Sequence, residues 1–323
     1  MTGGVYLSAY LEPLAPWLHR TDVTDILVNR PGEVWIETRD GAMLREAAPE
    51  VTELVLTRLA RQIAAASHQG VNREQPLLSA SLPDGARVQI IAPPATREGL
   101  ALAIRKHAIS DLSLDQLSDA GAFGRRAAAS SSDDELAALL ATGDLAAFLR
   151  TAVARRKTIV LSGGTSSGKT TLLNALIKEI GPRERLIAIE DAPEIRLHHP
   201  NAVGLISVRG EMGEARVDAE ALLQASLRMR PDRILLGELR GAEAFAFLRA
   251  VNTGHPGSIT TVHADTPRGA IDQIAMMALL GGLNVDWSAV QIYARQVIDV
   301  IVQMARVDGH RAVSRVLFQG QEY

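Results

Sequence analysis

Apolar residues near the start of the chain recur every three or four positions and then give way to short segments in which apolar and polar residues alternate. The helical spacing between Val5 and Leu18 predicts a short amphipathic helix. Three strand-like segments follow, DILVN at 25–29, EVWIET at 33–38 and AMLRE at 42–46, with turn residues between them. This pattern predicts a small antiparallel meander.

A helix and a second group of strands are expected next. Helical spacing over residues 52–68 precedes strand-like segments at 77–81, 86–93 and 99–106. Strands and helices grouped in this way are typical of an α+β domain. We therefore predict that residues 1–118 form an α+β domain, with a PAS-like meander plus helices.

A segment of small and polar residues separates this part of the chain from the next. Residues 119–134 read DAGAFGRRAAASSSDD, and so few large apolar side chains cannot bury enough surface to order the segment. Residues 119–143 are accordingly predicted to be a flexible linker, with a short helix toward its end. Asp144 is a candidate cap for the helix that follows.

The remainder of the chain has strand-like segments that are apolar throughout. They are TIVLSG (158–163), RLIAIE (185–190), RILLGEL (233–239) and SITTVHA (258–264), and segments of helix length separate them. Such runs are typical of parallel strands that helices bury on both faces. Residues 144–323 are predicted to form an α/β domain that ends in an antiparallel hairpin around Asp308-Gly309.

Composition narrows the range of functions. A chain of 323 residues is long enough for two domains, and its 47% hydrophobic and 22% charged residues indicate a folded protein. The absence of cysteine excludes disulfides, thiolate zinc sites and cysteine nucleophiles. A formal net charge of -3 gives no general basic field, so nucleic acid is not predicted as a direct ligand. Without a signal-peptide pattern or a long apolar run, we expect a cytoplasmic protein.

A phosphate-binding motif follows the first apolar strand of the second domain. Its glycines let backbone amides wrap a phosphate, its lysine reaches the terminal phosphates, and its threonine hydroxyl can ligate Mg²⁺. The motif predicts that the protein binds ATP with Mg²⁺ and that Thr170 is a metal ligand. The residues assigned to nucleotide binding are Gly163, Gly164, Thr165, Ser166, Ser167, Gly168, Lys169, Thr170 and Thr171.

Hydrolysis also requires a carboxylate that orients or activates water. Glu238 ends the apolar strand at 234–238, at the edge where phosphates bind in open α/β sheets, and we assign it as the catalytic base. The preceding residue is Gly237, although an ordinary Walker B segment has aspartate there. Another group is therefore expected to support the metal.

Further acids and a histidine are candidates for the same site. Glu190 and Asp191 end the strand RLIAIE, and Glu194 lies one turn onward. These acids are expected to order the attacking water or, for Asp191, the water shell of the metal; capping a helix is the alternative. His263 is expected beside the γ-phosphate as a hydrogen-bonding group.

Four segments in this order resemble the Walker A, Asp box, Walker B and His box of secretion ATPases: GGTSSGKTTLLNALI, RLIAIEDAPEI, LLQASLRMRPDRILLGELRG and GHPGSITTVHAD. NRPGEVWIE, LPDGARVQIIAPP and LALAIRK resemble the amino-terminal domain of the VirB11 family, the traffic ATPases of type IV secretion systems. A Walker B segment without aspartate is usual in that family.

The resemblance implies a homo-hexameric ring in which nucleotide lies between the amino-terminal domain and a RecA-like carboxy-terminal domain. It implies that Lys169 acts with arginines from outside the P-loop. By motif these are Arg87 and Arg105 of the first domain, together with Arg230 and Arg240, which flank the Walker B strand. The implied partners are type IV secretion components at the inner membrane, including other secretion ATPases. Peripheral attachment to the cytoplasmic face of that membrane is left open.

An ATP-hydrolysing motor is the leading interpretation, because a set of hydrolytic residues is joined through a linker to a non-catalytic domain. A nucleotide-gated assembly scaffold with little turnover stays open, since Gly237 weakens the metal site. Relatives in type II secretion and type IV pili usually carry a four-cysteine module that this chain lacks, although Tad-pilus ATPases stay open. A small-molecule kinase and a nucleic-acid translocase are less favoured.

Overall fold

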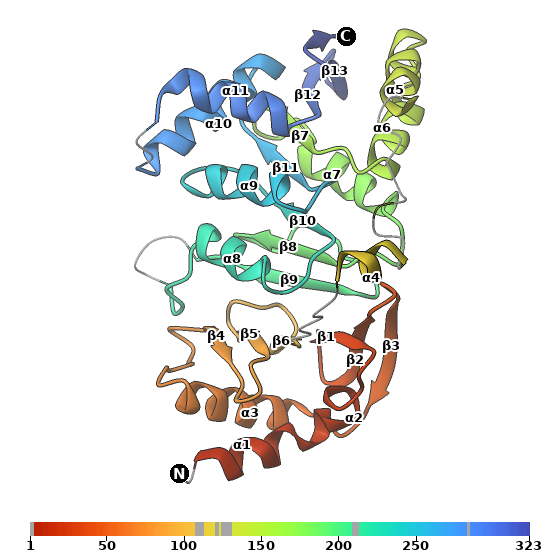
Figure 1. Ribbon diagram of the computed structural model, residues 1–323. Coiled ribbons are helices and arrows are strands. Elements are labelled where there is room, and N and C mark those ends of the chain that lie inside the picture. Colours follow the sequence, from red (N-terminus) through yellow and green to blue (C-terminus); the bar gives the residue numbers. More distant parts are fainter. Residues whose placement is uncertain (1–2, 107–112, 120–122, 124–130, 209–212, 283–284) are drawn as a thin grey trace.

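The chain folds into two domains that stack end to end (Figure 1). The computed structural model describes residues 3–106, 113–119, 123, 131–208, 213–282 and 285–323. Its first domain is antiparallel and its second is mostly parallel with flanking helices, so both predicted fold classes are confirmed. No helix in these described ranges is long and apolar enough to cross a membrane.

The chain starts with three short helical pieces, and the prediction of a single helix is therefore wrong. They are α1 (Gly3–Leu11), the 3-10 helix η1 (Glu12–Leu14) and α2 (Ala15–Leu18). Pro13 and Pro16 each lie in the first turn of the second and third pieces, where their missing N–H is tolerated. Leu14 and Trp17 are nevertheless buried, as the apolar spacing indicated.

One antiparallel sheet forms the centre of the first domain. Helix α3 (Glu53–Ala66) packs on one of its faces, and the Thr52 hydroxyl accepts a hydrogen bond from the Val55 amide at its start. The order of the strands in the described chain is β3-β2-β1-β6-β5-β4. Their bounds are β1 Val23–Val28, β2 Gly32–Thr38, β3 Met43–Ala48, β4 Leu77–Ser81, β5 Arg87–Ile91 and β6 Ala101–Arg105.

The second domain is built on a mixed sheet whose order, within the described residues, is β14-β13-β12-β7-β11-β10-β8-β9. Its strands are β7 Ile159–Gly163, β8 Leu186–Glu190, β9 Ala202–Ile206, β10 Arg233–Leu236, β11 Ile259–Val262, β12 Val300–Val307, β13 His310–Phe318 and β14 Gln321–Glu322. Its helices are α6 Leu145–Ala154, α7 Lys169–Lys178, α8 Ala219–Ser226, α9 Glu243–Asn252, α10 Pro267–Leu280 and α11 Trp287–Val297. Strands β12, β7, β11, β10, β8 and β9 are parallel, so their carboxyl ends meet at one edge.

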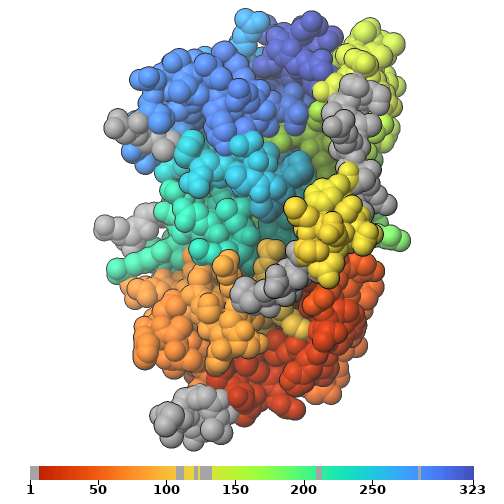
Figure 2. Space-filling view, in the orientation of Figure 1, coloured from red at the N-terminus to blue at the C-terminus, as the bar shows by residue number. Residues whose placement is uncertain are grey.

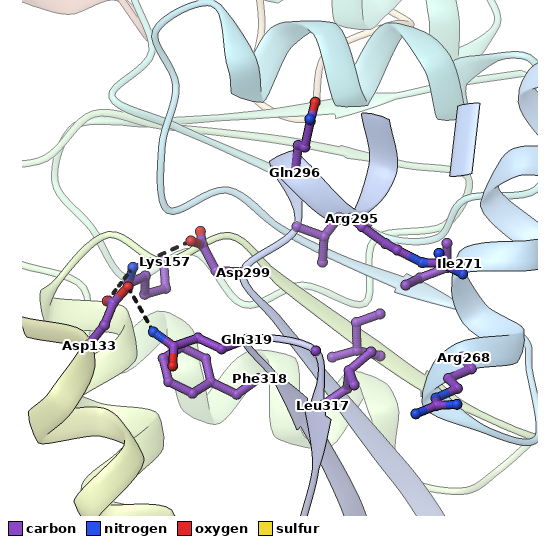
Figure 3. A pocket seen from close by; sticks show the side chains of 13 residues that line it. Asp133, Lys157, Arg268, Ile271, Arg295, Gln296, Asp299, Leu317, Phe318 and Gln319 are labelled. Carbon is purple, nitrogen blue, oxygen red and sulfur yellow. Dashed lines mark hydrogen bonds and ion pairs between the residues drawn. The ribbon is translucent and has the colours of Figure 1, made fainter. Parts of the chain in front are cut away.

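Helix α5 (Ser131–Ala141) lies inside the range that the sequence assigns to a linker. Its Leu136 and Leu140 are buried in the core of the second domain. Asp133 pairs with Lys157 Nζ at 2.7 Å, and the same ammonium contacts Asp299 (Figure 3). Helix α5 therefore packs on the second domain. Residues 120–122 and 124–130 lie outside the described residues, and the extent of the linker stays a prediction.

The two domains share a buried apolar cluster and several polar links. Leu27 and Trp35 of the first sheet belong to the same cluster as Leu222 and Met229 of the second domain. Residues 95–97 add a short antiparallel bridge to the edge strand β9, and Figure 1 shows β9 facing the first domain. Helix α4 (Leu114–Asp119, yellow) covers the boundary on the face in Figure 2.

Candidate functional site: the nucleotide cavity

The phosphate-binding loop joins β7 to α7 and lines a cavity of ≈ 480 Å³ at the carboxyl edge of the parallel strands. Residues Thr165–Thr171 form one wall. Gly163 adopts φ +154°, and a Cβ placed there would lie 2.5 Å from the Met304 carbonyl oxygen, so no larger residue fits. Lys169 Nζ donates to the carbonyl oxygens of Gly163 and Gly164 at 2.7 and 3.0 Å. The loop thus holds its own lysine at the point where the sequence places the phosphates.

Lys169 is buried at 8% exposure. Burial lowers the pKa of its ammonium, and Arg240 lowers it further, whereas Glu238 raises it. A buried cation without a compensating carboxylate in contact favours the arrival of an anion. The cavity is therefore suited electrostatically to a polyphosphate.

A chain of polar contacts crosses the cavity opposite the loop. Lys169 Nζ lies 3.5 Å from His263 Nδ1, and His263 Nε2 lies 2.9 Å from Glu238 Oε1. Because the ammonium can only donate, Nδ1 is the acceptor in this contact, and Nε2 is the ring nitrogen that faces Glu238 and can donate. Glu238 Oε2 accepts a hydrogen bond from Arg240 at 2.6 Å, which raises the pKa of Arg240. The residues predicted to act on the γ-phosphate therefore do meet.

Two further acids, Asp191 and Glu194, line the same cavity. Asp191 Oδ2 is 3.3 Å from Arg240, and Asp191 Oδ1 accepts from the Ser207 hydroxyl at 2.7 Å. Glu194 Oε2 accepts from the Thr170 hydroxyl at 3.2 Å. Carboxylate and hydroxyl oxygens are the ligands that Mg²⁺ prefers. Thr170, Glu194 and Asp191 thus offer oxygens of the kind that Mg²⁺ binds, although the described residues contain no group of three or more acidic or histidine side chains close enough to hold a metal by themselves.

Glu190 occupies the space that Gly237 leaves. A Cβ on Gly237 would lie 3.2 Å from Glu190 Cγ, so a side chain at 237 would require this glutamate to move by a few tenths of an ångström. Glu190 is 5% exposed, and its Oε2 accepts from the amides of Glu194 and Ile195 at 2.9 and 2.6 Å. It also forms an ion pair with Arg97 of the first domain. Glu190 thus lines the cavity, but its oxygens hold protein groups; action on water stays a prediction.

The chain is similar to known proteins over most of its length. Residues 8–319 match the family described as "Type II/IV secretion system protein". The chain is 37% identical to type IV secretion system protein VirB11 of Bartonella quintana, covering 95% of this chain and 91% of that one. It is 42% identical to type IV secretion system protein PtlH of Bordetella pertussis, covering 95% and 93%. The chain belongs to the type II/IV secretion system protein family.

The structure agrees with this assignment. The crystal structure of the VirB11 ATPase of the Brucella suis type IV secretion system, in complex with sulphate, superposes with a TM-score of 0.90 at 37% identity. The superposition covers 97% of this chain and 98% of that one. As a member of this family the protein is a P-loop secretion ATPase, which confirms the expected enzyme class and its use of ATP.

The first-domain arginines of this secretion ATPase do not line its P-loop cavity. Arg87 begins β5 and Arg105 ends β6, and the two are paired in register. Both line a separate cavity of ≈ 530 Å³ between the domains, with Arg228 and Arg230. Arg97, which pairs with Glu190 in the P-loop cavity, lies in the turn at the other end of these strands. A strand of five residues is about 16 Å long, so Arg87 and Arg105 lie about that far from this turn. Within one chain, the structure therefore separates these arginines from Lys169.

Arg311 of β13 lines the P-loop cavity of the ATPase, and the sequence analysis missed it. Its Cδ would lie 3.2 Å from a Cβ on Gly168. The terminal hairpin was predicted around Asp308-Gly309, but its position beside β7 was not, because hairpin residues carry no signal of the strand they join. Pairing of β12 with β7 brings Arg311 to the loop.

Proposed function

We propose that the protein is a hexameric motor that hydrolyses ATP to power a type IV secretion system, in substrate translocation or pilus biogenesis. The observation that carries this proposal is the line of contacts from Lys169 through His263 and Glu238 to Arg240, facing the phosphate-binding loop. A scaffold that only held nucleotide would not need a carboxylate kept between two cationic or proton-donating groups. The names of the relatives support the secretion system as the setting.

In the mechanism that follows, Lys169 exchanges the carbonyl oxygens of its own loop for phosphate oxygens. Mg²⁺, held by Thr170 and through water by Asp191, would supply positive charge to the phosphates. Glu238 then accepts the proton of a water aligned with the terminal phosphate, while the water oxygen bonds the γ-phosphorus and the bond from that phosphorus to the β–γ bridging oxygen breaks, releasing ADP and phosphate. Arg240 holds Oε2 of Glu238 by a hydrogen bond, and Oε1, which lies 2.9 Å from His263 Nε2 and has no hydrogen-bond partner in the described part of the chain, is left to take the proton.

Arg87 and Arg105 are proposed to complete the site of a neighbouring protomer. An arginine near the transferring phosphoryl group stabilises charge that develops in the transition state. Within the described residues neither side chain forms a hydrogen bond or an ion pair, and both line the cavity between the domains. A ring in which each first domain serves the next P-loop explains why these arginines are exposed here.

Mixing two inactive variants tests this arrangement. The Arg105→Ala variant has an intact P-loop, and the Lys169→Ala variant has an intact Arg105. Each variant alone is expected to release almost no phosphate. In a randomly mixed ring, about a quarter of the interfaces combine an intact loop with an intact neighbouring arginine, so activity should return to about that fraction. Mixtures that stay inactive, while wild-type rings form under the same conditions, would assign Arg105 to its own chain.

Ring assembly and turnover are measured on one sample. Native mass measurement with and without ATP, coupled to phosphate release, is expected to show six-subunit particles that hydrolyse ATP. Tight ATP binding without turnover, even with inner-membrane secretion components present, would instead favour the nucleotide-gated scaffold. We propose a cytoplasmic location, with contact to those components and to other secretion ATPases at the inner membrane.

A further inference from the structure

The loop at residues 191–196 of the second domain sets the position of two acids in the nucleotide cavity. Asp191 contacts Arg240, and Glu194 accepts a hydrogen bond from the Thr170 hydroxyl. A displacement of this loop would move both acids relative to the phosphate-binding loop. Because rates respond steeply to displacements of about 1 Å, whatever fixes the loop influences turnover.

The second domain fixes the loop from one side. Asn174 of α7 donates to the Glu194 carbonyl at 3.1 Å and accepts from the Arg196 amide at 2.7 Å. Since α7 begins at the phosphate-binding loop, these bonds tie the acids to the helix that follows it. Glu190 holds the other side of the loop, because its carboxylate accepts hydrogen bonds from the amides of Glu194 and Ile195.

The first domain fixes Glu190 and the loop together through one side chain. Arg97 forms an ion pair with Glu190 and donates from a second nitrogen to the Ile195 carbonyl at 2.9 Å. The side chains of Arg97 and Glu190 are 19% and 3% exposed, so water screens this pair little. A guanidinium suits the position because its planar fork can bond a carboxylate and a carbonyl at once.

The backbone around Arg97 is arranged to admit this side chain. Its amide donates to the Gly204 carbonyl at 3.0 Å, and the Ile206 amide donates to the Ala95 carbonyl at 2.9 Å. A Cβ on Gly204 would lie 2.5 Å from Arg97 Cδ. The arginine therefore passes over β9 at the one point where the strand has no side chain in its way.

We infer that Arg97 is a positioning residue of the ATPase site, supplied by the first domain to the second domain of the same chain. By holding Glu190 and the Ile195 carbonyl, it sets the loop that carries Asp191 and Glu194. Arg97 itself does not line the nucleotide cavity. The docking of the first domain on β9 is in this way linked to the geometry beside Thr170.

Arg97→Ala tests the inference, with Arg73→Ala as the matched control. Arg73 pairs with Glu214 across the same domain boundary, but this pair is exposed and neither residue lines the nucleotide cavity. In Arg97→Ala we expect kcat to fall on the order of 10- to 100-fold, with KM for ATP changed less than about threefold. Arg73→Ala should keep both values.

Amide hydrogen exchange supplies a second readout that does not depend on turnover. The amides of Glu194 and Ile195 should exchange about tenfold faster in Arg97→Ala, because the carboxylate that accepts them is no longer held. Arg97→Lys keeps the ion pair with Glu190 but not the hydrogen bond to the Ile195 carbonyl. Its kcat and its exchange rates should therefore be intermediate between those of the wild type and of Arg97→Ala. Wild-type kcat and exchange in Arg97→Ala, or equal losses in Arg73→Ala, would overturn the inference.

A second variant covers the case in which Arg97→Ala does not fold. Gly204→Ala keeps the arginine and its charge but fills the space that its stem occupies. The same loss of kcat and the same faster exchange at Glu194 and Ile195 are expected. A folded Gly204→Ala protein with wild-type values for both would refute the positioning role.

Discussion

Replacing Glu238 with glutamine is the most direct test of the chemistry at the cavity. The substitution keeps the shape of the side chain and one acceptor oxygen but removes the charge and the ability to accept a proton. Arg240 can only donate, so the glutamine oxygen should keep this bond, whereas the amide nitrogen meets His263 Nε2, which donates as well, and that contact is lost. The side chain should therefore be held in place through Arg240 while the base is lost.

The size of the effect follows from the contacts. General base catalysis contributes roughly 10²- to 10⁴-fold, which corresponds to about 2.7–5.4 kcal/mol in the barrier. The cost in stability should be small, on the order of 1 kcal/mol or less, because Arg240 keeps Asp191 and no cation is left unpaired. We expect kcat to fall at least about 100-fold while ATP affinity stays within a few-fold.

The assay is phosphate release at saturating ATP and Mg²⁺, beside ATP binding and thermal unfolding of the same preparation. Glu220→Gln is a suitable control, because Glu220 bonds Gln224 within α8 and does not line the cavity. Turnover of Glu238→Gln within about threefold of wild type would refute the assignment of the base. Loss of ATP affinity equal to the loss of kcat would place Glu238 in binding instead.

Two further predictions concern the ionisable groups of each domain. Lys169→Ala should abolish phosphate release and leave the unfolding temperature within a few degrees of wild type, because the ammonium contacts two carbonyl oxygens of its own loop and His263 rather than a carboxylate. A large loss of stability would contradict this. Burial raises the pKa of Asp25, so its contribution to folding is favourable at acid pH and is lost as pH rises through that raised value. Asp25→Asn should therefore raise the unfolding temperature at pH 7 by about 2 °C, and the gain should vanish toward pH 4 in a pH series; a constant gain would show that titration is not its cause.

The sequence was sufficient to predict those parts of the site that lie at the ends of buried parallel strands. Glu238 and His263 follow β10 and β11, so the strand pattern places both at the carboxyl ends of parallel strands, whereas the structure shows that these two strands are neighbours. The P-loop follows from β7 and α7 in the same way. The edge strand β9 was missed because its apolar run AVGLI is only five residues long and contains a glycine, and alternate residues in it are only partly buried.

Contacts between the domains could not be predicted in this way. Arg97 and Glu190 are far apart in the chain, and nothing in PPATREG distinguishes an arginine that is buried in an interface from one that is solvated. The need for a glycine at position 204 can be recognised only when the structure shows the Arg97 side chain crossing it. The break of the first helix, by contrast, could have been expected from Pro13 and Pro16, because proline begins a helical turn more readily than it continues one.

The positions of the arginines in the first sheet give the two proposals a common physical basis. Arg97 lies at one end of β5 and β6 and reaches the site of its own chain, whereas Arg105 lies at the other end and is proposed to reach the site of a neighbour. The strands between them are rigid over about 16 Å. If both proposals hold, a shift of the 191–196 loop during hydrolysis pulls on one end of a sheet whose other end carries an arginine of the next site. Each first domain would then transmit the state of one nucleotide site to another through a packed element, without any change in its own fold.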